Sequence, residues 1–188
     1  MIADGTLFDK QGRRLYLTAD ELDRFFAAAE DAPPRERIFC HVLARTGGRI
    51  SEILALKRRD IDQAAKAINI RSLKKRSKRH HRAVPVPPSL ICDLNLVFDL
   101  KRGRAEDWLW EVDVRTANRW VTRAIRAAGL DYHTPRSLRH TFATRAILKG
   151  VPITAVQKWL GHSDLKTTSI YAQVMGAEER SLAERMWS

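Results

Sequence analysis

The chain has 188 residues and a mass of 21.5 kDa, and its 34 Lys and Arg against 22 Asp and Glu give a net charge of +12. This length predicts one domain or two small ones, and a hydrophobic content of 44% argues against wholesale disorder. The sequence has no apolar run long enough to span a membrane and no secretory signal, so we expect a cytoplasmic protein. The excess of positive charge favours a polyanionic partner, most simply nucleic acid.

Apolar spacing and helix-end signals predict a mostly helical chain. Thr18 and Glu21 form a capping-box pattern, a proline pair precedes the second helix, and glycines end four of the helices. These signals predict helices over residues 18–29, 35–46, 50–56, 89–100, 113–128, 135–149, 152–160, 163–171 and 177–186. Cys40 and Cys92 lie in apolar periodic segments without metal-ligand spacing, which predicts two buried free thiols.

The positive charge is concentrated in one segment, because no acidic residue lies between Asp62 and Asp93. A helix of this composition would repel itself, whereas alternating apolar residues on both sides predict a β-hairpin near residues 67–86. Its basic residues are Arg71, Lys74, Lys75, Arg76, Lys78, Arg79 and Arg82. We expect the tip of the hairpin to lie along a phosphate backbone; the alternative is a solvated basic loop.

These elements predict an α+β protein that is mostly helical, with one small antiparallel sheet. Residues 17–188 should form a single domain, and residues 1–16 an extended N-terminal lead-in. No Asp, Glu and His cluster has metal-ligand spacing, so we expect no metal and no cofactor.

Three stretches are more specific than the composition: Thr46–Leu56, Thr134–Thr144, and Leu160–Tyr171. Taken singly, their functional candidates have plain structural explanations, such as a surface arginine, a basic helix face or a core tyrosine. Together they closely resemble the catalytic domain of the tyrosine recombinase (phage integrase) family. That family has an Arg after a glycine turn, a hairpin Lys, His-x-x-Arg, Leu-Gly-His and a later Tyr, and here Tyr171 follows His162 by nine residues.

The resemblance implies the catalytic-domain fold of that family and a chemistry without metal or ATP. It places Arg49 and Arg139 on the scissile phosphate, where planar, permanently charged guanidinium groups donate paired hydrogen bonds. It implies that His162 donates to a non-bridging oxygen. It makes Tyr171 the nucleophile, whose phenolate oxygen would hold the 3′-phosphoryl group covalently and leave again on rejoining.

The resemblance also implies a general acid for the departing 5′-oxygen, at the end of the first hairpin strand. Lys74 fits that position best. Lys75 would point to the opposite side of the strand because side chains alternate, and Lys78 would require a shorter first strand. For Lys75 and Lys78 the alternative is contact with the DNA backbone only.

Arg136 departs from the family pattern, because that position usually holds the histidine of His-x-x-Arg. Arginine keeps the positive charge and the donors but cannot act as a base near neutral pH. We therefore expect slower or differently pH-dependent activation of the tyrosine, with Arg136 still in the active site. His133 and His140 lie nearby, but neither occupies the family position, and His140 matches a family residue that is usually buried and supportive.

The length is a second departure, because most family members carry an N-terminal helical domain that clamps DNA and nothing here corresponds to it. We expect a catalytic-domain-only chain, similar to the fimbrial-switch invertases, or a fragment. The implied partner is double-stranded DNA, with four protomers acting on two sites and no membrane association.

Three functions remain open at this point. The leading one is a site-specific recombinase that acts through a 3′-phosphotyrosyl intermediate. The second is nicking and rejoining of a single duplex, like type IB topoisomerases. The third is a DNA-binding accessory or regulatory protein with weak or no cleavage, favoured by Arg136 and by the missing clamp.

Overall fold

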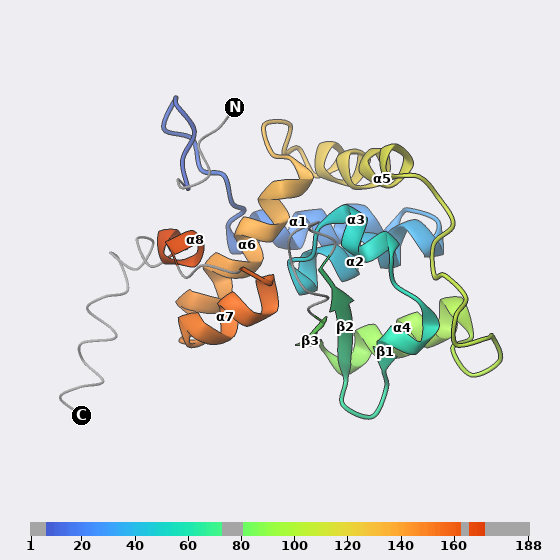
Figure 1. Cartoon of the computed structure of the whole chain (residues 1–188). Coiled ribbons are helices and arrows are strands. Elements are labelled where there is room, and N and C mark those ends of the chain that lie inside the picture. Colours follow the sequence, from blue (N-terminus) through green and yellow to red (C-terminus); the bar gives the residue numbers. More distant parts are fainter. Residues whose placement is uncertain (1–6, 73–80, 163–165, 172–188) are drawn as a thin grey trace.

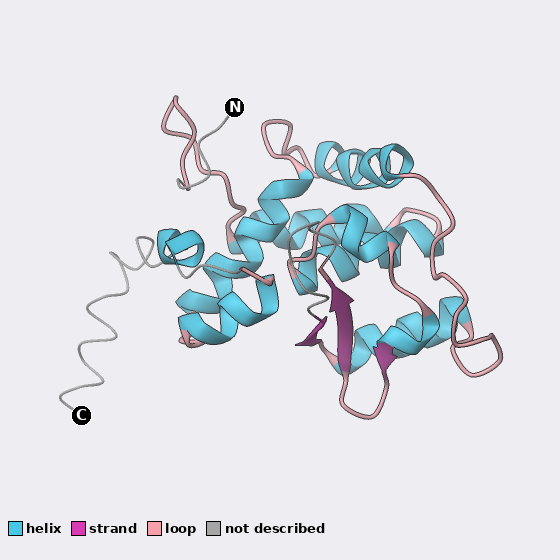
Figure 2. Cartoon of the chain, in the orientation of Figure 1, coloured by secondary structure: helices cyan, strands magenta, loops and turns pink. Residues whose placement is uncertain are grey.

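Helices make up most of the computed structural model, which describes residues 7–72, 81–162 and 166–171 (Figure 1; Figure 2). The described α-helices are α1 (Ala19–Glu30), α2 (Pro34–Thr46), α3 (Ile50–Leu54), α4 (Pro88–Phe98), α5 (Val114–Ala127), α6 (Pro135–Leu148), α7 (Ile153–Leu160) and α8 (Lys166–Ser169), and a short 3-10 helix spans Arg58–Asp60. This architecture confirms the mostly helical α+β class. The helix predicted over 177–186 lies outside the described residues, as does the start of the one predicted over 163–171.

The helix ends follow the local signals in the sequence. The Thr18 hydroxyl accepts from the backbone N–H of Glu21 at 3.2 Å, and the Glu21 carboxylate accepts from the backbone N–H of Thr18 at 2.7 Å. Asp113 caps α5 by accepting from the N–H of Thr116 at 2.6 Å. Gly47 ends α2 with φ of 61°, and a Cβ there would lie 2.6 Å from the Phe142 ring.

A three-stranded antiparallel sheet has the order β1 (Ile61–Asp62), β2 (Ala67–Arg71) and β3 (His81–Pro85). The hairpin of β2 and β3 was predicted. Strand β1 was not, because it has only two residues, too few to show an alternation of apolar and polar side chains. The register pairs Ile70 with Arg82 and Arg71 with His81. Since side chains alternate between the two faces of a sheet, neighbouring residues of one strand meet opposite surroundings.

The buried apolar residues form two clusters. The larger one joins α1, α2, α4, α5 and the sheet. The smaller one contains Leu7, Ala143, Ile147, Val156, Leu160 and Tyr171. Helix α6 contacts both α2 and α7 and crosses the middle of the molecule (Figure 1). Its Leu138 belongs to the first cluster and its Ala143 to the second, so α6 holds the two together.

The described part of the lead-in, residues 7–16, packs on this smaller cluster. Leu7 is buried in it, and Phe8 and Arg14 form an antiparallel bridge. Leu7 shares that cluster with Ala143 and Ile147 of α6, and directly after the lead-in the backbone N–H of Leu17 donates to the Thr141 hydroxyl on α6 at 2.8 Å. The lead-in thus contacts the helix that carries two of the predicted active-site arginines.

The two cysteines have different surroundings. Cys40 on α2 is buried, and burial raises the pKa of its thiol to about 12. Cys92 on α4 is exposed, so the prediction of a buried thiol there is wrong. The core face of α4 is formed instead by Leu90, Ile91, Leu94 and Phe98. No described helix is both long and apolar enough to cross a membrane.

Candidate active site

Arg139 on α6 connects two turns that are far apart in the sequence. Its Nη1 donates to the carbonyl oxygen of Gly47 at 2.6 Å, and its Nη2 donates to that of Leu160 at 2.7 Å. Gly47 lies two residues before Arg49, and Leu160 lies two residues before His162. One guanidinium group therefore brings the glycine turn of the first motif to the Leu-Gly-His turn of the third.

The charge of Arg139 lies in a partly desolvated setting. Burial, together with the positive charge of Arg49, lowers the pKa of its guanidinium to about 10. Glu52 and Tyr171 act in the opposite direction. Arg139 stays protonated at neutral pH, so it offers a fixed positive charge where water screens poorly.

Arg49 begins α3 as its N-cap residue, and Glu52 fixes its orientation. The Arg49 Nη1 donates to Glu52 Oε1 at 2.9 Å, and the Arg49 backbone N–H donates to Glu52 Oε2 at 3.0 Å. Glu52 thus both pairs with an arginine and caps α3. Arg49 keeps about a third of its side chain exposed, at 35%, and so has surface left for a ligand.

Arg82 differs from its prediction. We expected it to contact phosphate with the rest of the hairpin, but it is 5% exposed and its Nη2 donates to Glu52 Oε2 at 2.6 Å. Its Nε donates to the carbonyl oxygen of Trp159 on α7 at 2.6 Å. The reason is strand parity: Arg82 pairs with Ile70 on the face that points inward. Arg82 anchors the hairpin to α3 and α7.

Glu52 is the anion between two arginines. Burial alone would raise the pKa of its carboxyl group, but the charge and hydrogen bond of Arg82, followed by the contacts of Arg49, outweigh burial and lower that pKa. Glu52 is therefore ionised at neutral pH and offsets part of the positive charge around Arg139.

His162 follows the glycine that ends α7. Its Nδ1 lies 2.9 Å from the hydroxyl of Thr168 on α8, and Thr168 is fully buried. The N–H of His162 also donates to the carbonyl oxygen of Gln157 at 3.2 Å. These contacts hold the imidazole at the junction of α7 and α8, beside the turn that Arg139 binds.

Tyr171 lies just after α8 and is 2% exposed. Its hydroxyl oxygen is 3.0 Å from Nδ1 of His140, and the two ring centroids are 5.9 Å apart. His140 is itself buried on α6, next to Arg139. The resemblance implies a buried, supporting role for His140, and the structure adds a direct contact with the tyrosine hydroxyl.

The other predicted site residues are either exposed or outside the described part of the chain. Arg136 is exposed in the first turn of α6, one turn before His140. Arg71 is exposed at the end of β2, where the hairpin tip begins. The residues Lys74, Lys75, Arg76, Lys78 and Arg79 lie outside the described part of the chain, so their roles stay predictions.

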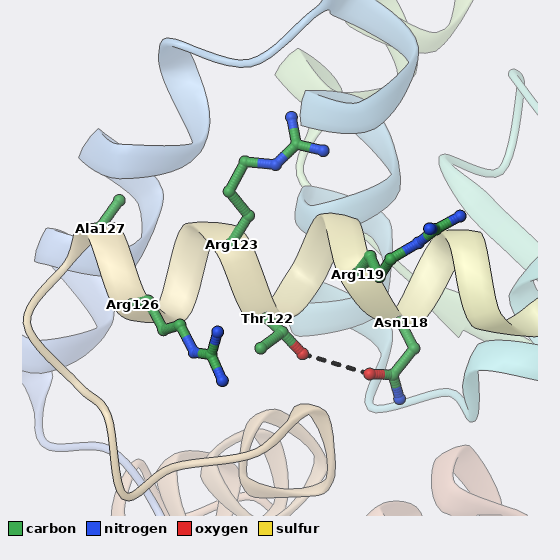
Figure 3. Close-up of a pocket in the computed structure, with 6 residues that line it drawn as sticks. All are labelled: Asn118, Arg119, Thr122, Arg123, Arg126 and Ala127. Atoms are coloured by element: carbon green, nitrogen blue, oxygen red, sulfur yellow. Dashed lines mark hydrogen bonds between the residues drawn. The ribbon is translucent and has the colours of Figure 1, made fainter.

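A basic row on α5 was missed by the sequence analysis. It lines a shallow pocket formed by Asn118, Arg119, Thr122, Arg123, Arg126 and Ala127 (Figure 3). Arg119, Arg123 and Arg126 are all exposed, and Arg123 also pairs with Glu36 of α2 at 3.4 Å. The signal was present in the sequence, because arginines four and three residues apart share a helix face.

The structure offers no evident metal centre within residues 7–72, 81–162 and 166–171. Among these residues no three His, Cys, Asp or Glu side chains are grouped so that they could hold an ion. The charges that converge on the site come from arginines.

Comparisons with known proteins agree with this fold. Tyrosine recombinase XerA of Thermococcus kodakarensis is 32% identical over 177 residues, which cover 90% of this chain and 61% of that protein. The crystal structure of XerA recombinase is 31% identical, with a TM-score of 0.76 over 91% of this chain and 64% of that one. XerH site-specific recombinase, solved bound to its difH substrate, shares the fold at 24% identity with a TM-score of 0.71, over 87% of this chain and 55% of that one.

The chain spans about three fifths of the length of its curated relative. The sequence model of the phage integrase family matches residues 15–178, which is most of the chain. The match includes the glycine turn, the hairpin, and both later motifs. The chain belongs to the phage integrase family.

Proposed function

We propose that this chain is the catalytic part of a site-specific DNA recombinase, which cuts and rejoins strands through a 3′-phosphotyrosyl intermediate. The observation that carries the proposal is the double hydrogen bond of Arg139 to Gly47 and Leu160. It gathers Arg49, Arg139 and His162 around one point, with the Tyr171 hydroxyl next to α6. The catalytic domain would be residues 17–188.

The proposed reaction is a transesterification at one phosphodiester. The Tyr171 oxygen attacks phosphorus, the bond from phosphorus to the 5′-oxygen breaks, and the 3′-phosphoryl group stays on the tyrosine. Negative charge builds up on the non-bridging oxygens, where the fixed charges of Arg49 and Arg139 stabilise it. The reverse reaction rejoins the strand, so the bond energy is conserved without ATP.

The departing 5′-oxygen needs a proton, and we assign that role to Lys74. It would reach the site from the hairpin, whose second strand is tied to α3 and α7 through Arg82. An ammonium group in that position can give its proton as the bond breaks and take it back on rejoining.

Double-stranded DNA is the proposed substrate. Support comes from the net charge of +12, from the exposed Arg71 beside the hairpin tip, and from the exposed arginines of α5 (Figure 3). XerH, which shares the fold, was solved bound to its difH substrate. As in the family, we propose that four copies act together on two sites.

The test is covalent trapping with nicked duplexes whose sequence is randomised around the nick. Cleavage near a nick releases a short strand that diffuses away, so the protein–DNA adduct survives denaturation and its DNA can be sequenced. Tyr171→Phe should give no adduct. Tyr132→Phe is the matched control, because it removes the hydroxyl of an exposed tyrosine, and it should react like the wild type.

The products distinguish the remaining alternatives. A recombinase should exchange strands only between two copies of the selected site. A topoisomerase-like enzyme would relax a supercoiled plasmid that has no such site. DNA binding without any adduct from the wild type would refute the enzyme and leave an accessory protein.

A further inference from the structure

We propose that His140 is the base that accepts the proton of the nucleophile Tyr171, a role that the family pattern places at the position of Arg136. This inference rests on the proposed function, because it assigns a step of that reaction. The observation behind it is the contact of 3.0 Å between the His140 Nδ1 and the tyrosine oxygen.

The geometry of this contact suits proton transfer. A general base must lie within hydrogen-bond distance of the proton that it takes, about 2.6–3.2 Å between heavy atoms. Both side chains are buried, with exposed fractions of 8% for His140 and 2% for Tyr171. A hydroxyl in an apolar cluster has little access to bulk water, so its proton needs an acceptor among its neighbours.

Arg136 cannot take this role. A guanidinium group stays protonated at neutral pH and has no acceptor atom. Arg136 and His140 are four residues apart on α6, so they share one face of the helix, with Arg136 exposed and His140 buried against the tyrosine. The family's usual base position and the proposed one are therefore adjacent turns of one helix.

The surrounding charges support the transfer. The charged and titratable groups near the site are Arg136 and Arg139 on α6, Arg49 and Glu52 at α3, Arg82 on β3 and His162 after α7. Most of them are cationic, which favours the Tyr171 phenolate once it forms. A phosphate bound by Arg49 and Arg139 adds negative charge, which helps the imidazole to hold the transferred proton.

In the proposed cleavage step, one proton passes from Tyr171 to His140 and a second one reaches the departing 5′-oxygen. As the Tyr171 oxygen attacks phosphorus, its proton moves to the Nδ1 of a neutral His140, which becomes imidazolium. The 5′-oxygen leaves with a proton from a different group, proposed above to be Lys74. On rejoining, the imidazolium returns the proton to the tyrosine oxygen, and the lysine takes back the proton of the attacking 5′-hydroxyl.

The main test compares adduct formation by His140→Asn and by the wild type on the duplex selected by trapping. An asparagine amide reaches the position of Nδ1 and can still hydrogen-bond the hydroxyl, but it cannot accept a proton near neutral pH. We expect the rate at pH 7 to fall about 10²–10⁴-fold. His41→Asn is the matched control, because His41 is also 8% exposed, and its rate should stay within a few-fold of the wild type.

The pH dependence separates a base from a merely structural residue. The wild-type rate should rise as the imidazole loses its proton, following the ionisation of His140 measured by NMR of the unmodified protein. His140→Asn should recover only at high pH, where hydroxide can remove a phenolic proton whose ordinary pKa is about 10. A structural defect would not recover in alkaline buffer.

A substrate with sulfur in place of the scissile 5′-oxygen separates the base from the acid. Sulfur leaves as a thiolate, since thiols ionise near pH 8.5, and needs no proton donor. With this substrate, Lys74→Ala should form the adduct at about the wild-type rate, whereas His140→Asn should stay slow. A wild-type rate of adduct formation by His140→Asn on this substrate would overturn the assignment of His140 as the base.

The outcomes for the two proposals differ. If the wild type forms no adduct, the proposed function fails and this inference fails with it. If the wild type reacts and His140→Asn matches or exceeds it, the function stands and His140 is not the base. If the variant does not fold, which its circular dichroism would show, a wild-type rate that does not track the NMR ionisation of His140 refutes the inference.

Discussion

Arg82 and Arg71 lie on the two paired strands of one hairpin, yet their side chains meet opposite surroundings. Arg82 is buried and bonded to Glu52 and Trp159, whereas Arg71 is exposed beside the hairpin tip. A similar contrast separates Arg139, which binds two backbone carbonyls, from the exposed Arg126 of α5. The inner arginines assemble the site, and the outer ones are available to a polyanion, although each carries the same charge.

The largest predicted effect comes from breaking the inner ion pair. Arg82→Ala leaves the Glu52 carboxylate buried without its strongest partner, which should lower the free energy of unfolding by about 3–5 kcal/mol. Arg71→Ala should change it by no more than about 0.5 kcal/mol. Urea unfolding followed by circular dichroism measures both, and equal effects of the two variants would contradict the contrast.

Replacing Arg139 tests, through the rate of adduct formation, whether the inner arginines assemble the site. Lysine keeps the charge of Arg139, but its single ammonium cannot hold the carbonyls of both Gly47 and Leu160 and also face a phosphate. Arg139→Lys should slow adduct formation about 10²–10³-fold. Arg102→Lys, at a side chain that is 88% exposed, is the control and should react at the wild-type rate.

The lowered pKa of Glu52 predicts how its contribution to the free energy of unfolding depends on pH. Its stabilisation is complete above the ionisation range of an unfolded glutamate, about pH 4.3, and is lost as the pH falls through the lower folded-state value. The stability difference between wild type and Glu52→Gln should therefore be constant near neutrality and shrink in acid. A difference that grew as the pH fell would show that the pKa is raised.

The smallest effects are expected from single outer arginines. Arg126→Gln should weaken DNA binding mainly at low salt and reduce the slope of log affinity against log salt by about 0.9 if it contacts one phosphate. The free energy of unfolding should be unchanged within about 0.5 kcal/mol. Titrations of labelled duplex at several salt concentrations measure the slope, and an unchanged slope would remove Arg126 from the interface.

Local signals allowed most helices to be predicted from the sequence. The capping box of Thr18 and Glu21 and the positive φ of Gly47 depend only on nearby residues, and both are present in the structure. The burial of Arg82 was not predictable in this way, because it depends on the register of the hairpin and on a carboxylate that is 30 residues away in the sequence.

The candidate site shows the same limit. The resemblance to the family implied roles for Arg49, Arg139, His162 and Tyr171, but not the contacts that join them. The contact of His140 with Tyr171 spans 31 residues, and no local rule distinguishes such a histidine from one that only fills the core. The basic row of α5, by contrast, follows ordinary helical spacing.

The unequal surroundings of the two cysteines make the unaltered chain suitable for site-selective labelling. These are its only cysteines, and maleimide chemistry requires an accessible thiolate. The exposed thiol of Cys92 should accept a fluorophore, while Cys40, with its pKa of about 12 and its place in the core, should stay unmodified. A dye on α4 could then report the approach of a labelled duplex by energy transfer, without any substitution in the protein.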